Sequence, residues 1–241
     1  STPPKTLNTP LAILVPHAGT IYSGATAGYA YKQIENTPYE RVIILGPSHQ
    51  IHHTSLAIPM ADGVTTPLGA IDFDGDLIEQ LCQSDPFKRD NSPHVKEHSL
   101  EVQFPFLQIA LPVPFLLIPI SVGAMDGDAL KKGAEKLATV VGEKTLLVIS
   151  TDLSHYHSQQ TATVLDQTTI GHILNLDADG LIGSYQRKAA ECCGIYPILL
   201  GLSIFKERGV TIHPILLHYD TSASTSLDDQ HVVGYASIGF S

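Results

Sequence analysis

Short, continuous runs of Leu, Ile and Val alternate along the chain with longer segments whose apolar residues recur at helical spacing. Continuous apolar runs of this length are typical of strands that are buried on both faces of a sheet. The predicted strands span residues 11–15, 41–45, 115–120, 145–149, 210–218 and 231–239. Proline cannot donate a hydrogen bond to a neighbouring strand, so Pro119 and Pro214 are expected to weaken their strands or to lie at a sheet edge.

Most of the remaining chain is predicted to be helical. The predicted helices span residues 23–34, 74–84, 126–141, 160–175, 177–188 and 194–208, and Gly209 is suited to end the last of them. Strands that alternate with helices indicate an α/β fold, here a three-layer α/β/α sandwich with a mostly parallel or mixed central sheet. No repeat or shift in composition divides the chain, so residues 1–241 are expected to form a single domain.

Three of the predicted strands run directly into a histidine. The residues that follow them are His17, His49 and, after the third strand, Asp152 and His155. In open α/β sheets, ligands bind just beyond the carboxyl ends of the strands. A single histidine in such a turn is often only a cap or a hydrogen-bonded support. Three histidines that follow three separate strands favour a shared functional site.

Two adjacent cysteines, Cys192 and Cys193, precede the last predicted helix. The free N–H groups at a helix N-terminus favour thiolate, which is both a nucleophile and a soft metal ligand. Cysteine is also among the most buried residue types, so inert packing is the alternative. Because Cys193 directly precedes Gly194, where the backbone can approach closely, we expect Cys193 to face the histidines and Cys192 to pack into the core.

A further segment that contains carboxylates and a histidine begins at Glu97. On a helix, Glu97 and Glu101 would share one face. No second histidine follows His98 at the spacing of a zincin helix. Two interpretations stay open for this segment. It forms either a capped, salt-bridged helix start, or an acid or base, Glu97 or His98, beside the metal cluster.

Charge and composition narrow the class of partner. The net charge is −10 with histidine neutral, so no nucleic-acid partner is expected. No apolar run approaches the ~20 residues that cross a bilayer, and we expect neither a membrane segment nor a signal peptide. Three cysteines do not make a disulfide framework, which fits a reducing, cytoplasmic location. The 12 histidines, against 14 Lys plus Arg, direct attention to metal binding, since histidine is the commonest metal ligand.

Five sequence blocks, in this order, resemble the Memo family. They span residues 15–24, 45–49, 97–106, 150–156 and 193–197. The resemblance implies a fold similar to class III extradiol dioxygenases, which hold non-haem Fe(II) with two histidines and a glutamate. It implies that the remaining cleft residues, beyond the histidine ligands His17 and His49, are Asp152, His155 and Cys193. The family also includes prokaryotic proteins found beside a radical-SAM protein and an AMMECR1-like protein, which the resemblance implies as partners.

The resemblance further implies that Cys193 stands where the dioxygenases have their carboxylate ligand. Two histidines and a carboxylate suit Fe(II) and O₂, whereas a thiolate shifts the preference toward Cu(I) or Zn. The leading interpretation is therefore a metal-binding redox protein that uses iron or copper, with zinc as a further candidate. The expected metal ligands are His17, His49, His155 and Cys193. The expected catalytic residues are His155, Asp152, Glu97 and His98, and no organic cofactor is expected.

Two alternatives belong to other functional classes. One is an extradiol-type iron dioxygenase that cleaves an aromatic small molecule, which needs a carboxylate ligand and an open apolar pocket. The other is a non-enzymatic module whose cleft captures a peptide or partner and whose ligands are vestigial. A metal analysis of protein purified without chelator separates the binding module from the two metal-dependent alternatives.

Overall fold

The structure, a computed structural model, describes residues 3–112 and 114–241. A sheet runs through this part of the chain in the order β10-β11-β1-β8-β2-β7-β3-β6, and β9 pairs with β11 beside it. Its strands are β1 (Ala12–Val15), β2 (Arg41–Gly46), β3 (Leu56–Ile58), β6 (Phe87–Arg89), β7 (Leu116–Val122), β8 (Thr145–Ser150), β9 (His155–His157), β10 (Pro214–Thr221) and β11 (Val232–Phe240). Strands β4 (Gly63–Thr66) and β5 (Gly69–Asp72) form a separate hairpin.

The centre of the sheet consists of parallel strands. β8 pairs in parallel with β1 on one side and with β2 on the other, and β2 pairs in parallel with β7. Every residue of β1 and β8 is buried, which is the burial that their continuous apolar sequences predict. At the margins, β11 is antiparallel to β1 and to β10, and β3 is antiparallel to β7. The sheet is therefore mixed, and the predicted α/β sandwich is confirmed.

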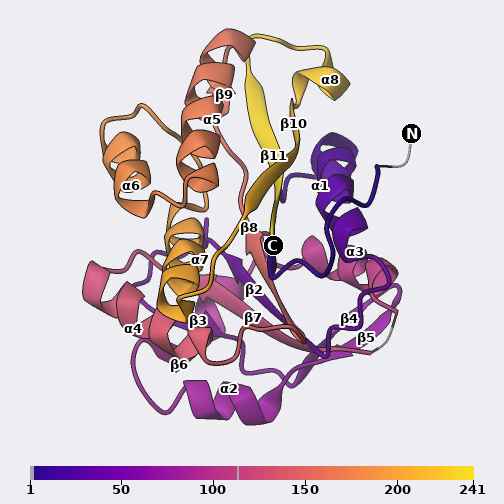
Figure 1. The fold of residues 1–241 in the computed structure, drawn as a ribbon, viewed down its shortest axis with the longest axis vertical. Helices are drawn as coiled ribbons and strands as arrows, with labels where there is room; N and C mark the ends of the chain where they lie inside the picture. Colours follow the sequence, from indigo (N-terminus) through magenta and orange to yellow (C-terminus); the bar gives the residue numbers. More distant parts are fainter. Residues whose placement is uncertain (1–2, 113) are drawn as a thin grey trace.

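Helices cover both faces of this sheet (Figure 1). One face carries α1 (Thr20–Ile34) and α3 (Gln103–Ala110), and the other carries α4 (Gly127–Ala138), α5 (Gln159–Leu174), α6 (Ala178–Gln186) and α7 (Ile195–Arg208). The shorter helical elements are α2 (Gly75–Leu81), α8 (Ala223–Ser226) and a 3-10 turn at Ser92–His94. Within the described residues, no helix has the length and apolarity needed to cross a bilayer.

Two residues of β11, Ser237 and Gly234, contact the two helical layers on opposite faces of the sheet. The Ser237 hydroxyl donates to the backbone carbonyl of Thr26 in α1. Gly234 faces the opposite layer, where an added Cβ would lie 2.0 Å from Oδ2 of Asp166 in α5. Successive side chains of a strand point to opposite faces, so positions separated by an odd number of residues contact different layers.

The two prolines differ in their positions. Pro214 is the first residue of the edge strand β10, as predicted. Pro119 lies inside the sheet, opposite Ile44 of β2, and the prediction of an edge position for it is wrong. The short strand β3 pairs with β7 only at Ser121 and Val122. Pro119 therefore lies beyond the end of that ladder, where its missing N–H costs no hydrogen bond to β3.

Two local predictions also differ from the structure. Glu97 and His98 lie in a loop, and α3 begins only at Gln103, so the shared helical face of Glu97 and Glu101 does not exist. The chain after Asp152 forms a short strand, β9, that the sequence analysis did not predict. This strand pairs with the end of β11, which its own brief polar sequence does not signal.

Helix α7 packs closely on the sheet at Gly201. A Cβ added there would lie 2.4 Å from Cδ1 of Ile149 in β8, closer than two carbon atoms approach without overlap. The buried apolar residues of the sheet and helices form one cluster that includes both elements. The position of α7, and of the residues that precede it, therefore depends on the absence of a side chain at Gly201.

We expect Gly201→Ala to lower the free energy of unfolding by about 1–3 kcal/mol, because the added methyl group overpacks the contact with Ile149. Gly171→Ala in α5 is the matched control, because a Cβ there meets nothing within 4 Å. Alanine is the better helix former by about 1 kcal/mol, so this control is expected to be neutral or stabilising. Urea denaturation followed by circular dichroism measures both. Equal stabilities of the two variants would contradict this account of α7.

Candidate metal centre

The ends of three adjacent strands bring the predicted site residues together. In the order β1-β8-β2 all three strands run parallel, so their carboxyl ends meet at one edge of the sheet. His17 follows β1, Asp152 follows β8, and His49 follows β2. Cys193 reaches the same edge from the residues just before α7. One potential ligand atom each from His17, His49 and Cys193 lies within 4.8 Å of the other two.

His17 and Cys193 form the closest contact in this group. Nε2 of His17 lies 3.2 Å from Sγ of Cys193. The His17 side chain is buried, with 1% of its surface exposed, and its ring packs edge-on against that of His49 with centroids 5.3 Å apart. Two imidazoles and one thiol therefore converge, although His17 and Cys193 are 176 positions apart in sequence.

Hydrogen bonds fix which nitrogen of His17 faces the thiol. The Ser150 hydroxyl donates its single hydrogen to the carbonyl of Ser99, 2.6 Å away, and accepts from Nε2 of Gln103 at 3.0 Å. It also lies 2.9 Å from Nδ1 of His17, which must then be the donor in that pair. Burial lowers the pKa of His17 to about 4, so the ring is neutral near pH 7. Nε2 therefore directs a lone pair at Cys193.

Glu97 orients His49 in the same manner. Its buried carboxylate accepts hydrogen bonds from Nδ1 of His49 at 2.9 Å, from the backbone N–H groups of His98 and Ser99 at 2.9 Å, and from the N–H of His49. Burial opposes the charge of Glu97, but these hydrogen bonds outweigh it and hold the pKa of the carboxyl below its ordinary value. The same contact raises the pKa of His49. With Nδ1 protonated, Nε2 of His49 is free for a metal.

His98 lies against both histidines of this group. Its ring stacks on that of His49, with centroids 5.2 Å apart and planes 16° from parallel, and meets the ring of His17 edge-on at 5.5 Å. Ligand atoms of His49, Glu97 and His98 also lie within 4.8 Å of one another. The sequence analysis assigned His98 a catalytic role and not a ligand role, but the structure makes it the third imidazole of the cluster.

His155, the fourth predicted ligand, is not a member of either group among the described residues. It lies on β9, where pairing with Val233 of β11 fixes the backbone, and its N–H donates to Oε1 of Glu191 at 2.9 Å. Its ring contacts that of Tyr156 at 5.9 Å between centroids. Of the four predicted ligands, the structure brings His17, His49 and Cys193 together, and β9 carries His155 toward β11 after Asp152.

Asp152 connects the turns that carry His17 and Cys193. Its Oδ1 accepts the backbone N–H of His17 at 2.8 Å, and Oδ2 lies 3.9 Å from Nε2 of the same residue. Its own N–H lies 3.2 Å from Sγ of Cys193, and its carbonyl accepts the N–H of Cys193 at 3.2 Å. The aspartate is buried and supplies a negative charge beside the cluster.

The two cysteines have the orientations that the sequence predicted. Cys192 is 3% exposed and belongs to the apolar core, whereas Cys193 is half-buried and faces His17. Gly194 permits this approach, since an added Cβ would lie 2.6 Å from Thr151. The expected acidification of the thiol by the helix N-terminus is not found. Burial, and then the charge of Asp152, raise the pKa of Cys193, so a bound cation is needed to stabilise its thiolate near pH 7.

Comparisons with known proteins show the family of this chain. A family model described as Memo-like protein matches residues 1–239. A MEMO1 family protein of Aquifex aeolicus is 36% identical over 238 residues, which is 98% of this chain and 88% of that protein. A MEMO1 family protein of Ignicoccus hospitalis is 35% identical over 237 residues, or 94% of this chain and 81% of that protein.

The fold is also that of a solved structure. The crystal structure of an uncharacterized protein, JW3007, from Escherichia coli K12 covers 93% of this chain and 98% of its own length. The TM-score is 0.54 at 13% sequence identity, so this likeness concerns the fold alone. Because the family model spans nearly every residue and the similar proteins match over almost their whole length, the chain belongs to the Memo-like protein family.

Proposed function

We propose that His17, His49 and Cys193 hold a redox-active metal ion, copper or iron, and that the chain is a metal-dependent oxidoreductase. One observation carries the proposal. Three ligand atoms lie within 4.8 Å of one another, and both imidazoles are oriented by hydrogen bonds at Nδ1 that leave Nε2 free. Metal-binding histidines almost always donate their second ring N–H in this way.

The chemistry of the donor set supports a soft or borderline ion. A thiolate with two neutral imidazoles prefers Cu(I) or Zn, and iron is also bound by such mixed sets. His17 is already neutral near pH 7, whereas the thiol of Cys193, and any His49 ring that its raised pKa keeps protonated, has to lose a proton on metal binding. When bound, copper or iron would supply one-electron redox chemistry, which zinc cannot.

The protein's own residues have separate tasks in this proposal. Ser150 and Glu97 hold the two imidazoles by their Nδ1 atoms. Asp152 fixes the turn at His17 and adds a negative charge that favours a cation. The ring of His98, stacked on His49, is available to accept or deliver a proton or to complete the ligand set.

A dioxygenase-like set of two histidines and a carboxylate is the second candidate, because His49, Glu97 and His98 also converge. The hydrogen bonds of Glu97 argue against it. Oε1 of Glu97 accepts from Nδ1 of His49 and from the N–H groups of His98 and Ser99, and Oε2 accepts the N–H of His49. Because Nδ1 of His49 donates to this carboxylate, Nε2, the nitrogen that is free for a metal, lies on the other side of the ring from Glu97, so the thiolate set is preferred.

Metal content tests the proposal. We expect Cys193→Ser to lose copper or iron, because a serine hydroxyl stays protonated near neutral pH and is a poor soft-metal ligand. Cys192→Ser is the matched control one residue away. It is expected to keep the metal and to lose about 1–3 kcal/mol of stability, because it buries a hydroxyl in the core. Elemental analysis of protein purified without chelator gives the stoichiometry. Equal metal content in the two variants, or a wild-type chain that binds no metal, would refute the site.

The role of His98 is tested against that of His155. We expect His98→Ala to weaken metal binding by about 10- to 100-fold, the range for residues that support a metal centre directly. His155→Ala should change the affinity far less, because His155 belongs to neither group of convergent ligand atoms among the described residues. Competition with a chromophoric chelator measures both affinities. A larger loss in the His155 variant would restore the four-ligand set inferred from the sequence.

Two substitutions of Asp152 separate the effect of its negative charge on metal binding from the effect of its hydrogen bond to His17 on stability. Asp152→Asn keeps an oxygen that accepts the N–H of His17, so we expect stability within about 1 kcal/mol of wild type and metal binding weakened about tenfold. Asp152→Ala removes the acceptor and leaves a buried N–H unpaired, which costs about 1–3 kcal/mol. Thermal unfolding and metal titration are measured on both variants. Unchanged metal affinity in Asp152→Asn would show that its charge does not act on the ion.

A further inference from the structure

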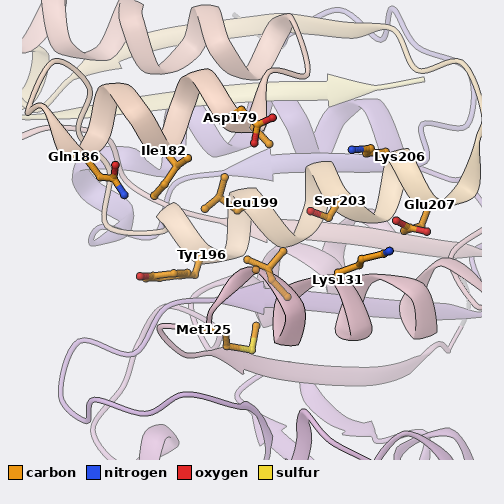
Figure 2. Close-up of a pocket in the computed structure, with 13 residues that line it drawn as sticks. Met125, Lys131, Asp179, Ile182, Gln186, Tyr196, Leu199, Ser203, Lys206 and Glu207 are labelled. Carbon is orange, nitrogen blue, oxygen red and sulfur yellow. The ribbon is translucent and has the colours of Figure 1, made fainter.

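Two cavities lie next to each other beside the candidate metal centre. The inner cavity, of about 180 Å³, is lined by Cys193 itself and by residues of the loop that follows β2. The outer cavity, of about 520 Å³, is a groove between α4, α6 and α7 (Figure 2). Nothing in the proposed metal chemistry uses the outer groove.

Three segments of the chain pass from one cavity into the other. Ala124 lines the inner cavity and Met125 the outer one, and the same holds for Tyr185 and Gln186. At the start of α7, Tyr196 lines both. Since residues adjacent in sequence lie within 4 Å along the backbone, the two cavities adjoin, and Tyr196 is their common wall.

Neither cavity alone has both the volume of a typical ligand site and a contact with Cys193. Sites for drug-sized ligands have volumes of roughly 300–1,000 Å³. The inner cavity alone is below this range and holds a single ring, whereas the outer groove alone does not contact Cys193. We propose that the two cavities form one two-chamber substrate site, divided by the Tyr196 side chain, for an elongated organic molecule with an uncharged ring at one end and a polar, ionised tail at the other.

The lining of the inner chamber selects the uncharged ring. Its walls include the rings of Tyr185 and Tyr196 and the side chains of Ile51 and Ile195. Of the described residues that line it, none is Asp, Glu, Lys or Arg, and the polar side chains are those of Ser48, His52, His53, Cys193 and the two tyrosines. The lining therefore offers no carboxylate, ammonium or guanidinium as a counter-ion for a charged group, whereas it offers aromatic faces and hydrogen-bonding partners for an uncharged ring.

The residues that line the outer groove indicate where the ionised tail of the ligand would lie. Figure 2 shows Tyr196 and Gln186 at one end of the groove, and Lys206 and Glu207 at the other end. Tyr196 and Lys206 are both on α7, where the rise of 1.5 Å per residue separates them by about 15 Å. Apolar side chains such as Leu199 line the groove between them. A ligand whose ring lies in the inner chamber therefore extends about 15 Å beyond Tyr196 before its ionised group lies beside Lys206.

The position of the ring next to a metal rests on the proposed function, but the two chambers and their partition do not. The test therefore uses the thiol of Cys193 as a reporter, in the full chain after treatment with chelator. Cys82 is replaced by Ser, and Cys192 is buried, so labelling is read at Cys193 by peptide mass spectrometry. Two reagents with the same reactive group are compared, N-methylmaleimide and the much larger N-(1-pyrenyl)maleimide. The ratio of their rates cancels the intrinsic reactivity of the thiol.

We expect Tyr196→Ala to raise the ratio of large to small reagent at least about tenfold, because a large ring no longer has to overpack the partition. Tyr196→Phe, which keeps the ring, should leave the ratio within about twofold of wild type. Ser203→Trp, placed in the outer groove midway along α7, should reverse the gain when combined with Tyr196→Ala. If Tyr196→Ala does not fold, Tyr196→Leu replaces it, since it keeps apolar bulk and removes the ring.

The outcomes are distinct. An unchanged ratio in Tyr196→Ala or Tyr196→Leu would show that Tyr196 is no partition. A gain that Ser203→Trp does not reverse would show that large molecules reach Cys193 by another route, and would overturn the two-chamber site. Because the assay is metal-free, a chain that binds no metal would refute the proposed function while leaving the ratios interpretable. Metal retention with unchanged ratios would refute only the two-chamber site.

Discussion

The parallel pairing of β8 with β1 and β2 is the constraint on which the site depends. It puts the carboxyl ends of three buried strands side by side, so that the turns holding His17, Asp152 and His49 begin at one edge of the sheet. Residues in these turns need no sequence proximity to meet. Asp152, after the middle strand, contacts the turn after β1 and both the thiol and the backbone N–H of Cys193, and this joins the sheet edge to the start of α7.

Polar side chains buried beneath the histidines carry the second part of the arrangement. Ser150, Gln103 and Ser99 form a buried chain of hydrogen bonds that ends at Nδ1 of His17. Glu97 does the same for His49 through a carboxylate that is charged in spite of its burial. Burial of a polar group is costly unless the group is hydrogen-bonded. The hydrogen bonds to the two histidines therefore account for the burial of these polar residues. They give the imidazoles one tautomer and one orientation before any ligand arrives.

The sequence predicted most of the sheet because its central strands are buried on both faces and therefore read as continuous apolar runs. It also predicted His17, His49 and Cys193, since strand ends and a helix start are visible in the pattern. It did not predict Ser150 or Gln103 as supports, although a serine that ends a buried strand and a glutamine at the start of a helix are detectable signals. His155 was expected to lie with these ligands, and its place on β9 could not be predicted for a different reason. β9 exists through pairing with β11, which is far away in sequence, and no local pattern reports such a partner. Glu97 was assigned to a helix by spacing alone, whereas the hydrogen bonds to its carboxylate fix a loop.

The separation of 176 positions between His17 and Cys193 has a consequence for folding. Bringing such distant residues together requires most of the chain to be ordered, so no fragment or partly folded state can assemble the ligand set. An ion that binds only the assembled set stabilises the native state as a whole, by about 2.7 kcal/mol at a free concentration 100 times its dissociation constant. Under the proposed function, loss of β1 from the sheet, or of α7 from its contact at Gly201, would separate the ligands and release the ion. Metal binding and global stability would then be coupled, so the free energy of unfolding would rise with the concentration of free metal.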